Sequence, residues 1–264
     1  MLYFPQLSTG SVGQFPIQKR RITRTVVNEA SDGARFKLAD ANAAAVEWIL
    51  SFQTLTDSER AALEQFHGSV EGSLGDFTFL DPTDNLLCWS EKLDEPAWER
   101  NLLLTVTTGV ADPQGGTNAN RITNTGSGPL AIEQVVNGPG SYEYAFSLQA
   151  RSDVAQQLTL IRSTATATQS SVYPIGPDWT PLLLSGTFAG NTDPSVTFGI
   201  QLQPGASADL FAIQVEAQMG ASGYKKTLSS CGVYPNARFL DDALAVQADG
   251  PSQHSCQIRI HSRA

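Results

Sequence analysis

The stretch NLLCWSEKLDEPAWERN, residues 85–101, reads like the beginning of a domain, although it stands about a third of the way along the chain. It carries two tryptophans, Trp89 and Trp98, and a short charged run. It directly follows FTFLDPTDN (77–85), which reads as the middle of a different domain. The sequence therefore indicates a second domain that begins before the first is complete.

Downstream of this boundary, residues 87–224 are acidic and alternate apolar with polar side chains. The segment has 5 Lys and Arg against 12 Asp and Glu, a net charge of −7. The alternation is clearest in YEYAFSLQA (142–150), SVTFGIQLQ (195–203) and DLFAIQVEA (209–217). In the last of these, Phe211, Ile213 and Val215 are expected on one face. Strands buried on one face, with Gly, Pro and Asn turns between them, predict an antiparallel β-sandwich.

Upstream, the first 86 residues combine strand patterns with one helix. Strands are predicted at ITRTVV (22–27), ARFKL (34–38), AVEWILSF (45–52) and GDFTFLDP (75–82). Thr56 and Glu59 have the spacing of a capping box, which predicts that a helix begins there. Gly68 stands where the helix is expected to end.

The C-terminal residues 225–264 change character again, with a net charge of +2 and strand patterns. One strand is expected to hold Phe239, Leu244 and Val246, and the last to hold Cys256, Ile258 and Ile260. Two or three strands cannot bury a core alone. Residues 1–86 and 225–264 are therefore predicted to form one discontinuous host domain, a β-sandwich or barrel with one α-helix. Residues 87–224 are predicted to be inserted into one of its loops.

Composition excludes several classes of function. The 264 residues are 41% apolar and 16% charged, as in a globular protein, and the net charge of −9 argues against nucleic acid as a main partner. The basic run Lys19-Arg20-Arg21 with Arg24 is interpreted as a solvated face or a subunit contact, with nucleic-acid contact as the alternative. No apolar run approaches the roughly 20 residues of a membrane span.

Cysteine usage indicates the compartment. Cys88, Cys231 and Cys256 cannot build a disulfide framework, and one of them must stay unpaired. The first residues, MLYFPQLSTG, do not resemble a signal peptide. We therefore expect synthesis in a reducing cytoplasm.

No catalytic or metal-binding motif stands out, and we expect no enzyme activity. Nucleophile-elbow, phosphate-loop and dinucleotide patterns are missing. His254 and Cys256 are interpreted as partly buried strand residues rather than metal ligands. The acidic groups at Asp81/Asp84, Asp94/Glu95 and Asp241-Asp242 are assigned to caps and turns. Oxygen ligation of a structural calcium ion in the insert, through Asp209 or Asp112, is left open.

Aromatic residues of the insert are the candidate binding residues. Sugar-binding sandwiches stack pyranose rings on exposed tryptophan and tyrosine, and Trp98, Trp179 and Tyr173 are assigned to such a site. The competing interpretation is that these rings fill the core, as Tyr142 and Tyr144 are expected to do.

The host segments resemble a known family. YFPQLSTGSVGQFPIQKRRITRTVV (3–27), WILSFQTLTDSERAALEQFHGSVEGSLGDFTFLDPTDNLL (48–87) and ARFLDDALAVQ (237–247) are similar to the distal-tail or tail-tip proteins of tailed phages and gene-transfer-agent particles. NLLCWSEKLDEPAW (85–98), NRIT (120–123) and DLFAIQVEAQMGASGYKKT (209–227) resemble the carbohydrate-binding-like jelly-roll modules of phage tail proteins.

The resemblance implies a structural protein of the virion tail, assembled in the bacterial cytoplasm. It would form a ring, with six copies as the family expectation, between the tail tube protein and the hub or tip proteins. The insert would project outward, either to touch cell-surface glycan or simply to decorate the tip. Two alternatives remain: a stand-alone carbohydrate-binding or glycan-hydrolysing protein, and an assembly factor that is absent from the finished particle.

Overall fold

The computed structural model describes residues 2–263, and the chain divides into two compact units. Unit 1 comprises Met1–Ser8, Val12–Phe79 and Tyr234–Ala264, and unit 2 comprises Thr9–Ser11 and Leu80–Val233. Residues 80–86 and 225–233 therefore belong to unit 2, whereas the sequence placed them in the host. Hydrogen bonds explain the difference: Leu86 N donates to Val215 O at 2.8 Å, and Asn85 Nδ2 donates to Ile213 O at 2.9 Å.

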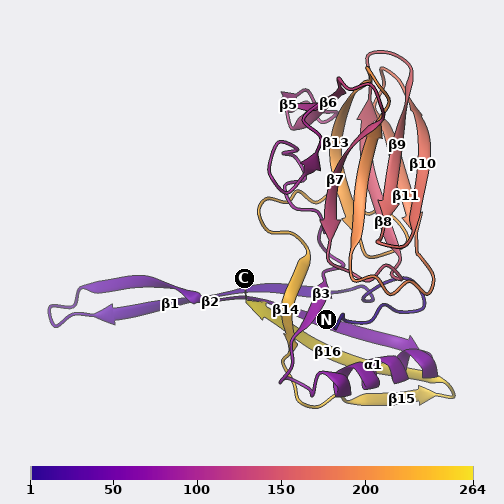
Figure 1. The fold of residues 1–264 in the computed structure, drawn as a ribbon. Coiled ribbons are helices and arrows are strands. Elements are labelled where there is room, and N and C mark those ends of the chain that lie inside the picture. The colour runs from indigo at the N-terminus through magenta and orange to yellow at the C-terminus, as the bar shows by residue number, and fades with distance from the viewer. Residues whose placement is uncertain (1, 264) are drawn as a thin grey trace. The chain divides into compact units, whose positions relative to one another are not determined.

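Unit 1 is built on one sheet. Its strands are β1 (Gln18–Glu29), β2 (Arg35–Leu55), β3 (Phe77–Leu80), β14 (Val233–Phe239), β15 (Val246–Gly250) and β16 (Gln253–Arg263). They follow the order β1-β2-β16-β14-β3, with β15 paired to β16 (Figure 1). Phe239 and Val246 lie in different strands, so the single strand predicted for them is wrong. Leu244 lies between these strands, where the chain turns.

Helix α1 (Asp57–Ser69) begins where the sequence predicts. The Thr56 hydroxyl accepts from Glu59 N, and the Glu59 carboxylate accepts from Thr56 N, which completes the capping box. The end differs from the prediction because Gly68 lies inside the helix and Val70 is its C-terminal cap. Val70 N–H closes the last turn onto the Phe66 carbonyl, so no left-handed glycine is needed there.

The inner face of β2 supplies much of the core of unit 1. Trp48, Leu50 and Phe52 are buried, as alternation predicts, and they pair with Ile260, Ile258 and Cys256 of β16. Around them lies an aromatic cluster in which most ring pairs meet edge to face, made by Phe4, Phe66, Phe77, Phe79, Tyr234 and Phe239. This core fixes α1 and both chain ends of unit 1 to one sheet.

Unit 2 is a sandwich of two antiparallel five-stranded sheets (Figure 1). Sheet I has the order β10-β9-β12-β7-β4 and sheet II has the order β11-β8-β13-β6-β5. The strands of sheet I are β4 (Glu99–Arg100), β7 (Leu130–Val136), β9 (Gln156–Ser163), β10 (Thr168–Ile175) and β12 (Val196–Leu202). Those of sheet II are β5 (Leu104–Val110), β6 (Ala119–Asn124), β8 (Tyr144–Arg151), β11 (Thr180–Gly186) and β13 (Ser207–Glu216). The predicted fold class, mainly β with an antiparallel sandwich and one helix, is confirmed.

The inner faces follow the predicted alternation, with one exception in β13. Phe198 of β12 packs against Tyr144 and Phe146 of β8, at ring distances of 5.6 and 5.5 Å. In β13, Phe211 pairs with Gln149 but Val215 pairs with Phe146, and these partners lie on opposite faces of β8. An irregularity at Ala212, whose φ is +54°, adds a residue between them. Phe211 therefore lies on the outer face of sheet II, contrary to the predicted shared face.

Candidate functional site

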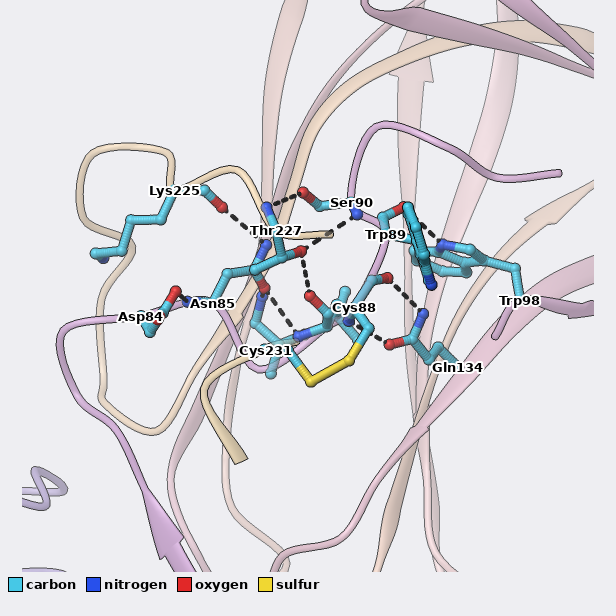
Figure 2. Close-up of a disulfide and its surroundings, with 12 residues drawn as sticks. Asp84, Asn85, Cys88, Trp89, Ser90, Trp98, Gln134, Lys225, Thr227 and Cys231 are labelled. Atoms are coloured by element: carbon cyan, nitrogen blue, oxygen red, sulfur yellow. Dashed lines mark hydrogen bonds between the residues drawn. A yellow bond between two sulfur atoms is a disulfide. The ribbon is translucent and has the colours of Figure 1, made fainter. Parts of the chain in front are cut away.

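A disulfide lies where the chain enters and leaves unit 2. Cys88 and Cys231 are bonded across 143 residues of sequence, with their Cα atoms 4.9 Å apart (Figure 2). Gln134 of β7 faces the backbone of Cys88: its carbonyl accepts from Cys88 N at 2.6 Å, and its amide donates to Cys88 O at 3.0 Å. The sequence did not predict this bond. Cys256, in unit 1, is the unpaired and buried thiol.

Hydrogen bonds also join the two chain segments that the disulfide links. Thr227 N donates to Ser90 Oγ at 3.0 Å, and the Thr227 hydroxyl donates to the Leu87 carbonyl at 2.6 Å (Figure 2). Asn85 Oδ1 accepts from Val215 N at 3.0 Å. Residues 85–90 and 225–231 are thus held to one another and to β13 where the chain enters and leaves unit 2.

Trp98, a predicted sugar-stacking residue, lies in the core. It is 2% exposed, and its indole N–H donates to the Trp89 carbonyl at 3.1 Å. Stacking on a sugar needs an open ring face, so Trp98 is a core residue in this fold. Trp89 is half-buried, and the Lys92 ammonium lies 5.8 Å from its ring centroid.

Trp179 lies at the outer face of sheet II and is half-buried. It packs against the cluster of Ala119, Phe211 and Ala212. The Arg151 guanidinium lies 4.8 Å from the Trp179 ring centroid, a cation–π arrangement that occupies one face of the indole. Trp179 is the predicted site residue whose surroundings best suit contact with a ligand at the surface.

Tyr173 lies on β10 of sheet I, whereas Trp179 lies at the outer face of sheet II. Tyr173 pairs with the fully buried Leu158, so it stands on the inner side of sheet I. Its hydroxyl donates to the Leu183 carbonyl on β11, the edge strand of the other sheet. Tyr173 thus joins the two sheets along one edge. The three predicted residues occupy three different environments and form no common site.

The buried carboxylates of Asp209 and Asp112 accept hydrogen bonds from donors within the protein. Asp209 is 1% exposed and receives Arg121 Nε at 2.6 Å and Arg151 Nε at 3.0 Å. Asp112 accepts from the backbone N–H groups of Gln114, Gly116 and Asn118, and the bond from Asn118 N contributes most to lowering the pKa of its carboxyl. Both oxygens of each acid face donors, which argues against the calcium site left open above. Within residues 2–263, no group of three or more His, Cys, Asp or Glu is placed to hold a metal ion.

The acidic pairs that were assigned to turns divide between local and long-range bonds. Asp81 accepts from Thr83 N at 2.8 Å, a turn contact within the chain segment. Asp241 binds Arg259 of β16, and Asp242 accepts from Ser73, so these two acids join distant segments. His254 lies on β16, as predicted for a strand residue, and its Nε2 is 2.8 Å from Asp57 Oδ1.

A pocket of about 280 Å³, lined by charged, hydroxyl and apolar groups, lies in unit 2 beside β5. Its wall on one side is the segment after Trp89, with Glu91 and Asp94, and on the other Thr108 and Thr117. Lys226 also lines the pocket and forms an ion pair with Glu91. The sequence placed Asp94 in a turn and did not predict this pocket. Local patterns carry no signal for it because its walls come from three distant segments.

Unit 1 carries the second candidate surface, a two-stranded arm formed by residues 23–44. Within residues 2–263, β16 pairs with β2 only as far as Ala45, so beyond it β1 and β2 pair with each other alone. Figure 1 shows this hairpin projecting from the rest of the sheet of unit 1. Phe36 and Leu38 stand on one face, each 59% exposed, and Val27 is 51% exposed on the other.

Three residues of the basic run at the root of the arm, Lys19, Arg20 and Arg24, have partners within the protein. The Lys19 ammonium lies 5.9 Å from the Trp48 ring and 5.8 Å from the Tyr234 ring. Arg20 pairs with Glu47, and Arg24 lies 3.8 Å from Asp40. Alternation sends neighbouring side chains to opposite faces, so the run forms no single basic patch. No helix among the described residues has the length and apolar character needed to span a membrane.

Comparison with known proteins finds similarity in fold only. No family model matches the chain, and no curated protein does. The enzymatically active domain of tailspike protein 4 of bacteriophage CBA120 is 13% identical, with a TM-score of 0.42 over 52% of this chain and 22% of that one. The CBM22-1 xylan-binding domain of Paenibacillus barcinonensis Xyn10C is 12% identical, with a TM-score of 0.42 over 54% of this chain and 99% of that domain. TmCBM61, solved with β-1,4-galactotriose, is 11% identical, with a TM-score of 0.37 over 50% and 97%.

Proposed function

We propose that the chain is a structural component of a phage or phage-like tail. Unit 1 would form a ring, with six copies as the resemblance implies, that joins the tail tube to the tip or baseplate. Unit 2 would be a peripheral module that contacts glycan on the host surface. In this proposal the chain is not an enzyme, inserts into no membrane and reads no nucleic-acid sequence. Its place is the virion tail, after assembly in the bacterial cytoplasm.

The arm of unit 1 is the observation that carries the ring proposal. A two-stranded ribbon is marginally stable in water when nothing covers it. The ion pairs along it, Arg24 with Asp40 and Arg35 with Glu29, are exposed and contribute little. Its large apolar side chains, Phe36 and Leu38, face solvent together. A neighbouring copy that covers this face in a head-to-tail contact would stabilise the arm, and such contacts generate a ring where the rotation between copies closes.

Two arm variants test the assembly. Phe36→Ser combined with Leu38→Ser removes the exposed apolar face, whereas Lys37→Ser, between them on the opposite face, is the matched control. Light scattering after size exclusion should give an oligomer for the wild type and for Lys37→Ser, and a monomer with an unchanged circular dichroism spectrum for the double variant. A wild type that stays monomeric at high concentration, and remains so when mixed with tail tube protein, contradicts the ring.

The stand-alone carbohydrate-binding or glycan-hydrolysing protein remains the second candidate because unit 2 has both a sandwich fold and a pocket with charged and hydroxyl groups. A glycan array and a hydrolysis assay on the full chain separate the two candidates. Turnover of any polysaccharide would favour the second. Mass spectrometry of purified particles distinguishes a tail component from an assembly factor, which would be missing from them.

A further inference from the structure

The pocket beside β5 is shaped by an irregular strand. Pairing between β5 and β6 shifts between Thr107 and Val110, and Gly109 has a φ of +76°. A side chain at Gly109 would meet no atom within 4 Å, so the bulge leaves the backbone bare at the pocket wall. Val110, the next residue, packs against the apolar cluster that also carries Trp179. The wall is therefore anchored although the pocket is open.

On one side of the pocket, Glu91 is held in place and its charge is paired within the protein. The Glu91 side chain is 10% exposed and pairs with the Lys226 ammonium. Its second contact is the Tyr224 hydroxyl, which donates to Glu91 Oε1 at 3.3 Å. The Glu91 backbone carbonyl is also held, by Asn120 Nδ2 at 3.0 Å. Glu91 thus shapes the pocket, and its charge is already matched.

The remaining groups are free to meet a ligand. Asp94 is exposed and makes no hydrogen bond or ion pair with the residues that the structure describes. The hydroxyls of Thr108 and Thr117 are likewise exposed and unpaired within residues 2–263. Lys92 is held over the Trp89 ring, and Leu228 adds a short apolar wall. An acceptor, two hydroxyls, a cation and an apolar edge thus surround one small space.

These groups suit a neutral polyhydroxylated ring. Two acids, Glu91 and Asp94, and two lysines, Lys92 and Lys226, give the pocket no net charge. The surrounding segment 87–224 carries −7, which disfavours anionic ligands. A carboxylate accepts from vicinal hydroxyls, while threonine hydroxyls both donate and accept. We propose that this pocket binds one neutral hexose or N-acetylhexosamine unit, a proposal that rests on the glycan-contacting half of the proposed function.

Saturation-transfer NMR on the full chain tests the pocket. The probes are glucose, galactose, mannose and N-acetylglucosamine, with N-acetylneuraminic acid as the anionic comparison. The variants are Asp94→Ala, which removes the open acceptor, and Thr117→Tyr, which fills the space. Glu99→Ala, an exposed carboxylate on β4 of sheet I, is the control. Circular dichroism confirms that each variant is folded.

At least one neutral sugar should show transfer with the wild type and with Glu99→Ala, and both pocket variants should weaken its binding about tenfold or more. The proposal is overturned if no neutral sugar shows transfer or if only the anionic sugar does. It is also overturned if Asp94→Ala and Thr117→Tyr bind the neutral sugar as well as the wild type does. Loss on Trp179→Ala with both pocket variants intact assigns the sugar to Trp179 and also overturns it. The oligomeric state of the same samples reports on the ring separately, so either half can fail alone.

Discussion

The indole N–H of Trp98 donates a 3.1 Å hydrogen bond to the carbonyl oxygen of Trp89. Trp89 has a φ of +54°, a conformation that costs a non-glycine residue of order 1–3 kcal/mol. The bond therefore helps to hold a strained residue whose ring in turn supports Lys92 at the pocket. Trp98 acts through position and packing, not through contact with a ligand.

Trp98→Ala should destabilise unit 2. Removing a buried tryptophan costs about 3–5 kcal/mol, and for a domain of this size that lowers the melting temperature by roughly 10 °C. Trp98→Phe keeps most of the side-chain volume but not the N–H donor. Its melting temperature should fall between those of the wild type and Trp98→Ala. Trp179→Ala, at a half-buried position, should cost less. A Trp98→Ala protein that melts like the wild type would contradict the core assignment.

Part of this fold was accessible from the sequence because it is encoded locally. The Thr56–Glu59 capping box depends on a spacing of three residues, and it forms as predicted. The alternation of Phe198, Ile200 and Leu202 depends only on strand geometry, and all three are buried. Where a bulge adds a residue, as at Ala212, the same alternation fails, and Phe211 moves to the outer face.

The rest depends on pairings between distant residues. Nothing near Cys88 indicates Cys231, because the sandwich itself brings them together. Asp209 reads as an ordinary strand acid, yet it is buried by two arginines that come from β6 and β8. Trp98 and Trp179 look alike in sequence, and only the structure separates a core ring from a surface one. The pocket, with walls from three segments, was out of reach for the same reason.

Reduction of the disulfide should weaken unit 2 selectively. A bond that closes 143 residues removes much of the entropy of the unfolded chain, and typical losses on removing such a bond are about 2–5 kcal/mol. We expect Cys88→Ser with Cys231→Ser to lower the melting transition of unit 2 and to make it insensitive to dithiothreitol. Cys256→Ser is the control, and its transition should still shift on reduction. Identical melts with and without reductant would contradict a structural role for the bond.

Cys256 should be an unreactive thiol in the folded protein. Burial raises the pKa of its thiol to about 11, so the nucleophilic thiolate is scarce near neutral pH. Ellman's reagent at pH 8 should react slowly with the native chain and quickly with one thiol after denaturation without reductant. Rapid reaction of the native protein would mean that the sheet around Cys256 opens readily, and three reactive thiols after denaturation would mean that the disulfide had not formed.

Acid should weaken the contact between α1 and the β15–β16 turn. His254 Nε2 and the Ser252 hydroxyl both lie 2.8 Å from the Asp57 carboxylate, and these bonds lower the pKa of Asp57 below its ordinary value of 3.8. A lowered pKa contributes stability above the ordinary value, and the contribution is lost as the pH falls through the lowered one. The melting temperatures of the wild type and Asp57→Asn should differ at pH 7 and converge below about pH 4. A constant difference down to about pH 3 would contradict this.

Unit 1 should fold without the insert. Asp81 N donates to Gly232 O at 2.8 Å, so the chain enters and leaves the inserted segment at one point, and a two-residue turn can bridge it. We expect a chain in which Asn-Gly replaces residues 82–231 to be soluble, to melt cooperatively and to protect β2 and β16 from hydrogen exchange. If it also assembles like the full chain, and loses assembly when Phe36 and Leu38 become serine, the contact lies in the arm. Aggregation of the shortened chain, or exchange without protection in β16, would show that the two ends of the chain depend on the sandwich to fold.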